Sequence, residues 1–152
     1  MEPTEERIEQ GDGEAGRIYW DCSDAVIGAC VDVHRHLGPG LLESAYERCV
    51  AHELALRKVR FEAQVAVPLK YKGLELDCGY RLDLVVEDVL VLEIKAVDRL
   101  LPIHQAQLLT YLRLTGREVG LLVNFHEPTL KNGLRRLTLS PTKNPPRLPA
   151  SL

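Results

Sequence analysis

Asp83, Glu93 and Lys95 are the residues of this sequence whose types and spacing could do chemistry. Glu93 and Lys95 are two positions apart, so on a strand they share one face while Ile94 points to the other. If Asp83 lies on the neighbouring strand of a hairpin, two carboxylates converge beside an ammonium group. Carboxylate oxygens are the ligands of magnesium where it keeps several waters and binds a substrate phosphate. The three residues therefore indicate a magnesium site suited to phosphoryl chemistry.

The chemistry of such a site explains why these residue types are needed. A metal ion would polarise a phosphoryl oxygen and favour deprotonation of a water, while Lys95 would orient that water or offset charge in the transition state. The spacing by itself is a weak signal, because acids and lysines that alternate on a strand more often form a solvated face. Apolar surroundings favour the chemical interpretation, because an unpaired charge is costly there. These neighbours are Leu90, Val91, Leu92, Ile94, Ala96 and Val97.

The periodicity of apolar residues predicts the elements that position these side chains. Helical spacing predicts helices over residues 23–37, with Ser23 as the N-cap, and over residues 42–58, separated by the stop Gly38-Pro39-Gly40. The period then changes to two, which predicts a three-strand meander. A helix follows Pro102 and ends at Gly116. The predicted strands are 59–69, 74–86 with a bend near Gly79, 89–96, the buried strand 119–125 and the short edge strand 135–139.

This order of elements predicts an α/β fold with a mixed central sheet flanked by helices. We expect one ordered domain over residues 18–139. Residues 1–17 read as a flexible acidic tail, and residues 140–152 as a proline-rich tail without regular structure.

Charge and hydropathy restrict the classes of partner. Six acids and one arginine give residues 1–16 a charge of -5, so the rest of the chain carries +2 of the total of -3. Mild basicity neither requires nor excludes nucleic acid, because a local patch decides binding. No apolar run approaches the roughly 20 residues needed to cross a membrane, and the acidic start is unlike a signal peptide. We therefore expect a cytoplasmic protein whose four cysteines are reduced and mostly buried.

The ordered motifs resemble the PD-(D/E)xK nuclease superfamily, with Asp83 as the isolated acid and Glu93-Ile94-Lys95 as the E-x-K element. Gln107 and Tyr111 are similar to the Q-x-x-x-Y motif of its exonuclease-type branch, and they share one helix face. Glu43 matches the acid that many members carry on the first helix. The resemblance implies a restriction-endonuclease-like core. It also implies Mg2+ or Mn2+ held by Asp83, Glu93, Glu43 and the backbone carbonyl of Ile94, with Lys95, Gln107 and Tyr111 completing the catalytic site.

A narrower resemblance involves the GxxExxY proteins, whose signature is matched by Gly40-Leu41-Leu42-Glu43-Ser44-Ala45-Tyr46. Together with the other motifs, this likeness extends over residues 24–137. The positions that look like the next block of that family are Phe61, Gln64, Pro68 and Tyr71.

Two functions of different classes follow as expectations. The first is a Mg2+- or Mn2+-dependent nuclease, with DNA favoured over RNA as the nucleic acid. The second is a catalytically silent protein of the nuclease fold that binds nucleic acid or a protein partner as an accessory subunit. By analogy with enzymes that pair two active sites across a duplex, we also expect a homodimer.

Overall fold

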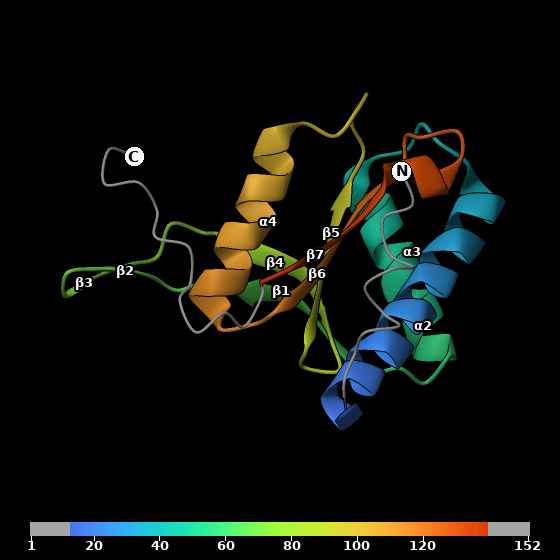
Figure 1. Ribbon diagram of the computed structural model, residues 1–152. Helices are drawn as coiled ribbons and strands as arrows, with labels where there is room; N and C mark the ends of the chain where they lie inside the picture. The colour runs from blue at the N-terminus through green and yellow to red at the C-terminus, as the bar shows by residue number, and fades with distance from the viewer. Residues whose placement is uncertain (1–12, 140–152) are drawn as a thin grey trace.

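The computed structural model describes the backbone of residues 13–139 and the side chains from residue 22 to residue 139. It contains a mixed sheet flanked by three helices (Figure 1). The helices are α2 (Gly13–Leu37), α3 (Glu43–Leu56) and α4 (Pro102–Thr115), and a short 3-10 helix η1 spans Leu130–Gly133. The strands are β1 (Phe61–Ala66), β2 (Leu69–Tyr71), β3 (Leu74–Leu76), β4 (Arg81–Val86), β5 (Leu90–Lys95), β6 (Val119–Asn124) and β7 (Leu134–Thr138).

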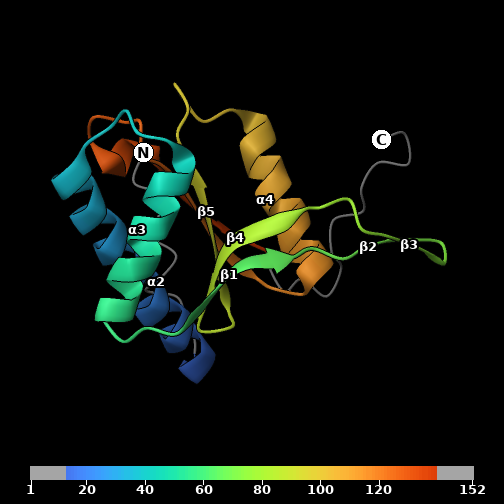
Figure 2. The ribbon, with the colours of Figure 1, turned by 180° about the vertical axis from the view of Figure 1, so that it is seen from behind.

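The main sheet has five strands in the order β1-β4-β5-β6-β7. Only the β5–β6 pair is parallel, and α4 makes the crossover between these two strands. Figures 1 and 2 show α4 on one face of the sheet and α2 with α3 on the other. The predicted α/β class with a mixed sheet between helices is therefore confirmed, including the short edge strand at the end of the domain.

Alternation along β5 assigns its residues to the two faces. Leu92 and Ile94 belong to the core that α2 and α3 cover, whereas Val91 packs with Leu108 and Leu112 of α4. Glu93 and Lys95, which alternate with Ile94, therefore lie on the same side as α4. The chemically interesting face of the strand is thus the one that the Q-x-x-x-Y helix covers.

The meander differs from the prediction, because two of its expected strands are each broken in two. The first breaks at Pro68, which has no N–H to continue a ladder. The second breaks at residues 77–80, where the Asp77 side chain accepts a hydrogen bond from the N–H of Gly79, a residue at φ +75. The freed halves pair with each other as β2 and β3 and form a separate hairpin, here called the β2–β3 arm, which projects beyond the main sheet (Figure 2).

The first helix begins earlier than predicted, at Gly13. Ser23 is not its N-cap but lies inside the helix, fully buried, and its hydroxyl has no partner among the described residues. The expected tail over residues 1–17 is therefore wrong for residues 13–17, which are helical, because the helix continues past the N-cap signal into a segment of weak apolar periodicity. The remainder of that expected tail and residues 140–152 lie outside the described part of the chain.

The other predicted elements agree closely with the structure. Gly116 ends α4 in the left-handed conformation at φ 69, and all six residues of β6 are buried. No described helix is long and apolar enough to cross a membrane. Cys22 and Cys30 are buried free thiols, and burial raises the pKa of each to about 12, but Cys78 is exposed. The expectation that the cysteines are mostly buried is thus wrong for Cys78, which lies in the loop at the base of the arm.

Candidate active site

Asp83 and Glu93 face each other where β4 and β5 separate. The ladder of backbone hydrogen bonds pairs residue 84 with 92 and continues away from the site, so the acids stand at its last step. The N–H of Asp83 donates to Glu93 Oε1 at 3.0 Å, and the N–H of Ile94 donates to Asp83 Oδ2 at 2.8 Å. The two carboxylates therefore occupy the positions of backbone acceptors, and this exchange fixes their orientation in the sheet.

The environment disfavours the ionised form of both acids. Burial is the main cause that raises the pKa of Glu93 from 4.5 to about 8, followed by the charge of Asp83. Burial likewise raises the pKa of Asp83 from 3.8 to about 6, although the hydrogen bond from Ile94 opposes this. Lys95 lowers the pKa of each acid. Two like charges that cannot both ionise at neutral pH without a counter-charge make a site that favours a cation.

The oxygen atoms left over fit such a cation. Asp83 Oδ1 and Glu93 Oε2 accept no hydrogen bond from the described residues, so each is available to a hard ion. Within the described part of the chain, no three residues of the His, Cys, Asp and Glu types stand close enough to hold a metal together. The donor set that the described residues provide at this point is therefore the acid pair.

Lys95 ends β5 beside the acid pair and is held there through its backbone. Its carbonyl accepts a hydrogen bond from Phe125 N–H at 2.8 Å. Two residues after Lys95, the backbone of Val97 is bound by the fully buried side chain of Asn124. This side chain accepts a hydrogen bond from Val97 N–H at 3.0 Å and donates one to Val97 C=O at 2.8 Å. Lys95 forms no ion pair with any described acid. Its backbone is thus fixed at the end of β5, beside the acid pair.

Glu43 begins α3 and acts on the acid pair through its charge. It is exposed, and its negative charge raises the pKa of both Asp83 and Glu93. An acid in the first turn of a helix also interacts favourably with the helix dipole, so this position is stable without any metal. The structure therefore places Glu43 near the pair but not in a ready group of three ligands.

The other members of the G-x-x-E-x-x-Y signature hold the loop that leads to Glu43. The hydroxyl of Tyr46 donates to the carbonyl of Gly38 at 2.5 Å and accepts from Leu41 N–H at 3.1 Å. The ring of Tyr46 is fully buried and stacks on Phe125 at 4.5 Å between centroids. Gly40 has φ +104, a conformation that glycine adopts without strain. The glycine and the tyrosine are thus structural, and the glutamate is the member whose charge acts on the acid pair.

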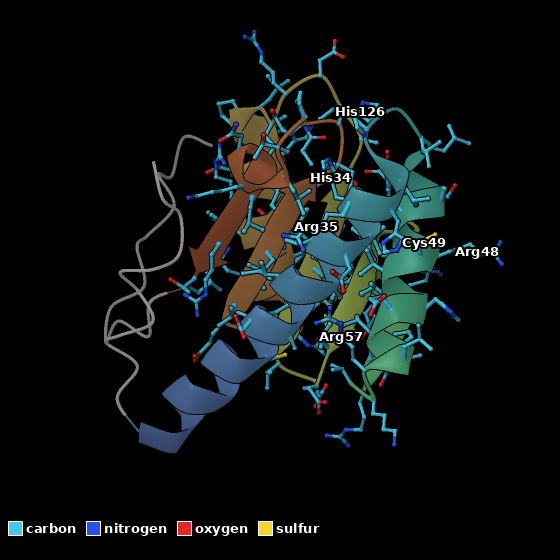
Figure 3. The ribbon with its side chains drawn as sticks, turned by 90° about the vertical axis from the view of Figure 1, so that its right-hand side faces the viewer. His34, Arg35, Arg48, Cys49, Arg57 and His126 are labelled. Carbon is cyan, nitrogen blue, oxygen red and sulfur yellow. The ribbon has the colours of Figure 1, made fainter. Side chains whose placement is uncertain are left out.

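Two histidines connect the end of α2 and the loop before α3 to the segment after β6. His34 Nε2 donates to the carbonyl of Glu127 at 2.8 Å, and His126 Nε2 donates to the carbonyl of Leu41 at 3.2 Å. Figure 3 shows both histidines at one end of the molecule, near the top of α2. The imidazoles of His34 and His36 contact different partners, as their spacing of two on a helix predicts. These histidines are scaffold residues.

Gln107 and Tyr111 share a face of α4, as the sequence predicts. Gln107 Nε2 donates to the hydroxyl of Tyr111 at 3.0 Å. Burial, and next the charge of Glu93, raise the pKa of Tyr111, so its ring lies within electrostatic range of the acid pair. Tyr80, at the base of the arm, lies 6.0 Å from the Tyr111 ring between centroids. Gln107 and Tyr111 therefore border the site, and Tyr80 extends this border towards the arm.

Two residues near the site were missed by the sequence reasoning. Asn124 ends an apolar strand, and nothing in its local pattern distinguishes it from an ordinary strand terminus. Glu47 raises the pKa of Asp83, more than Glu43 does. Its spacing of four from Glu43 was the available signal, because such residues share one helix face.

Three basic residues outside the site, Arg57, Arg60 and His104, are engaged in the scaffold. Arg57 pairs with Asp32 and Glu53, and Arg60 pairs with Glu87. His104 Nδ1 accepts from Leu101 N–H at 2.9 Å and so caps the first turn of α4.

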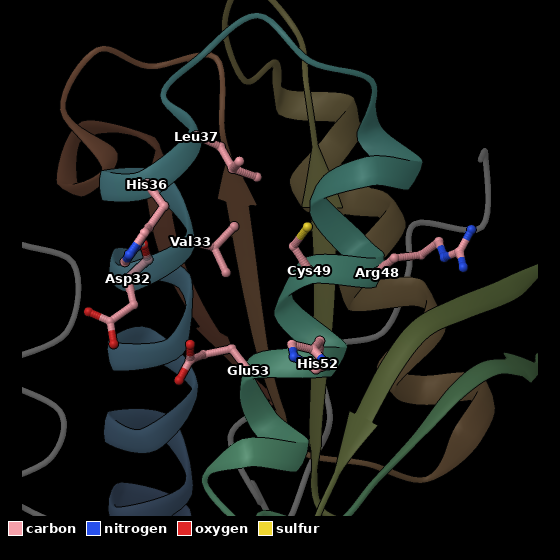
Figure 4. A pocket seen from close by; sticks show the side chains of 8 residues that line it. All are labelled: Asp32, Val33, His36, Leu37, Arg48, Cys49, His52 and Glu53. Atoms are coloured by element: carbon pink, nitrogen blue, oxygen red, sulfur yellow. The ribbon is translucent and has the colours of Figure 1, made fainter.

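A hollow between α2 and α3 is separate from the acid pair. Figure 4 shows it between α2 and α3, with a volume of about 390 Å3. It contains both signs of charge, and none of its residues is a candidate of the site. The lining residues are Asp32, Val33, His36, Leu37, Arg48, Cys49, His52 and Glu53.

Comparison with known proteins gives one match. The family model of the PD-(D/E)XK nuclease superfamily fits residues 20–137, which include α3, α4, most of α2, the sheet apart from the last residue of β7, and every candidate residue. Neither the curated proteins nor the solved structures contain a match. Members of this superfamily typically use divalent metals and act on nucleic acid. The mixed five-strand sheet between three helices agrees with that match. The chain therefore belongs to the PD-(D/E)XK nuclease superfamily.

Proposed function

We propose that this protein is a divalent-metal-dependent nuclease that hydrolyses phosphodiester bonds, with Mg2+ or Mn2+ as the ion and DNA favoured over RNA. The observation that carries the proposal is the buried pair Asp83 and Glu93, whose pKa values are both raised and whose second oxygens are free of hydrogen bonds. Asp83 and Glu93 would hold the ion, together with the backbone carbonyl of Ile94. When bound, such an ion polarises a phosphoryl oxygen and favours deprotonation of a water.

The remaining residues have roles that follow from their positions. The ammonium of Lys95 would orient the attacking water or offset negative charge as the phosphate reacts, which is a task for a compact cation. Glu43 would contact water at the exposed side of the site, since it stands at the start of α3. The hydrogen-bonded pair Gln107 and Tyr111 would border the substrate on the α4 side.

Cleavage assays with the Lys95→Ala variant test the proposal. The wild-type protein should cut DNA in Mg2+ or Mn2+, and Lys95→Ala should lower kcat by at least 100-fold, the range of one electrostatic group in a preorganised site. Lys70→Ala makes the same change of charge on the exposed arm and should leave kcat within about twofold. Parallel reactions with RNA would show which nucleic acid is preferred. Equal kcat values for Lys95→Ala and wild type would refute the assignment.

A second candidate function, an accessory subunit without cleavage, is favoured by one feature. The register of the β2–β3 arm places Leu69, Tyr71, Leu74 and Leu76 on one face, and Tyr71 and Leu74 are 61% and 54% exposed. An apolar face of this kind suits a protein partner. Thermal melts discriminate the two functions, because an ion that binds the native state must stabilise it. The accessory role is supported if metal leaves the Tm unchanged while Asp83→Asn raises it.

The oligomeric state is a separate proposal. A homodimer would suit a nuclease that acts on both strands of a duplex. Light scattering at the working concentration measures it directly, and a monomer mass would exclude the dimer.

A further inference from the structure

Gln64 has a backbone conformation that its position in a strand does not explain. Its φ is +55, in the left-handed region that non-glycine residues rarely adopt. The other non-glycine residues with positive φ, among those described, are Lys58, Lys72, Glu87 and Asp88, and all lie in turns. Gln64 instead lies inside β1, where its neighbours Ala63 and Val65 pair regularly with Leu84 and Leu82. The position opposite Gln64 in this register is Asp83.

Within the described part of the chain, the side chain of Gln64 forms one hydrogen bond, and its partner lies on α3. Its Nε2 donates a hydrogen bond to Glu47 Oε1 at 2.6 Å, across 17 residues of sequence. The Gln64 residue is exposed, so the left-handed conformation gains no apolar burial. Strained backbone that buries nothing is typical of residues held for function.

Glu47 is the second acid on the face of α3 that carries Glu43. The two acids are one helical turn apart and share a face of α3, while Tyr46 between them points into the core. The hydrogen-bond partner of Glu47, Gln64, stands opposite Asp83 in the β1–β4 register, so the Glu47 carboxylate is tied to the residue beside that acid. A half-buried glutamate beside two buried acids is repelled by them unless something holds it in place. The amide of Gln64 is the group that holds it.

We propose that Gln64 is a positioning residue, which through its left-handed backbone and its amide holds Glu47 at the rim of the acid pair. Helix α3 then supplies two carboxylates to the site, Glu43 and Glu47. Glu47 accepts a hydrogen bond from water bound there, since magnesium and manganese sites of this kind retain several waters. Partners beyond the direct ligands orient such waters, and their loss typically lowers metal affinity by 10- to 100-fold. This inference rests on the proposed metal-dependent nuclease.

The Gln64→Gly variant distinguishes a positioning role from a merely structural one. A positioning role predicts weaker Mn2+ binding together with a higher Tm, whereas a structural role predicts unchanged Mn2+ binding. Glycine adopts a positive φ without strain, so Gln64→Gly should raise the Tm of the metal-free protein by about 2–4 °C. The same variant should weaken Mn2+ binding, followed by calorimetry or by the metal-induced shift in Tm, by 10- to 100-fold. Cleavage should lose kcat with KM for DNA little changed. Higher stability with poorer metal binding is the expected signature.

Lys58→Gly is the matched control. Lys58 also has a positive φ, +59, but it lies in the turn after the far end of α3 from Glu43. The Lys58→Gly variant should show a similar rise in Tm and keep the Mn2+ affinity of the wild type. Gln64→Asn, whose shorter amide tolerates the left-handed region, is a second variant that should also lose affinity if Gln64→Gly folds poorly.

Each outcome is decisive. If Gln64→Gly and Gln64→Asn bind Mn2+ within twofold of wild type, Gln64 is not a positioning residue and the irregular backbone serves only to keep the edge strand β1 from pairing with other chains. If the wild-type protein itself shows no Mn2+-induced rise in Tm, the proposed function fails and the inference fails with it. If Mn2+ raises the Tm of the wild type and raises the Tm of both variants less, the proposed function and the positioning role of Gln64 are both supported.

Discussion

Replacement of Glu93 by glutamine should stabilise the metal-free protein near neutral pH. Glu93 is 5% exposed, and burial with the charge of Asp83 raises its pKa from 4.5 to about 8. At pH 7 the unfolded chain has therefore released this proton, while most of the folded protein retains it. Glutamine is neutral in both states and has nearly the shape of the protonated acid. The variant should consequently avoid a cost that the wild-type protein carries.

The sign and the size of this cost follow from linkage. Because the folded pKa is raised, the acid contributes no penalty below pH 4.5, and stability falls as the pH rises from 4.5 to about 8. The 2.5 pH units between 4.5 and 7, at about 1.4 kcal/mol each, give roughly 3 kcal/mol. For a chain of this size that corresponds to a Tm higher by about 6–12 °C in Glu93→Gln.

Thermal melts between pH 4 and pH 9, with and without Mg2+, measure this effect. The Tm difference between Glu93→Gln and the wild type should grow from pH 4.5 to pH 8 and then level off. Mg2+ should raise the Tm of the wild type, increasingly at higher pH because only ionised carboxylates bind it, and should leave the variant unchanged. Glu62→Gln, at an exposed position of β1, should change neither curve. Equal Tm values at pH 7 for variant and wild type, or an equal gain from Mg2+, would refute the reasoning.

Two further predictions concern the scaffold of the site. Asn124→Ala removes both hydrogen bonds to the backbone of Val97 and leaves these backbone groups without partners. It should therefore lower the free energy of unfolding, measured by urea denaturation, by about 2–3 kcal/mol. An unchanged midpoint would contradict this, and Asn132→Ala on the exposed surface is the control. Tyr46→Phe keeps the ring stacked on Phe125 but loses the bonds to Gly38 and Leu41, so it should cost about 1–2 kcal/mol in the same assay. A loss below about 0.3 kcal/mol would show that the hydroxyl does not fasten the loop.

The outline of the fold and the central acid pair could be predicted from the sequence. The periodicity of apolar residues is set by the covalent geometry of helices and strands, so it located α3, β5, α4 and β6 without knowledge of their neighbours. The alternation of Glu93, Ile94 and Lys95 assigned two of them to one face for the same reason. Gln107 and Tyr111 were paired correctly because a spacing of four on a helix brings side chains together.

The breaks in the chain could be recognised only in part. Pro68 and Gly79 are visible breakers, yet a strand that bends and a strand that ends look alike in sequence. Which of these occurs depends on whether the freed backbone groups find partners elsewhere. Here they find each other, and the β2–β3 arm results. Ser23 had the residue type of an N-cap, but the helix continued through it because its face is buried against the sheet.

Tertiary structure alone decided the electrostatics of the site and its supporting residues. The sequence fixes which side chains carry charge, but a raised pKa requires burial and a close second acid, and both arise only when β4 and β5 pair. Asn124 and Gln64 act on residues 27 and 17 positions away through hydrogen bonds. No local pattern encodes such contacts, since hydrogen bonding and Coulomb interactions depend on distance in space, whereas periodicity depends on distance along the chain.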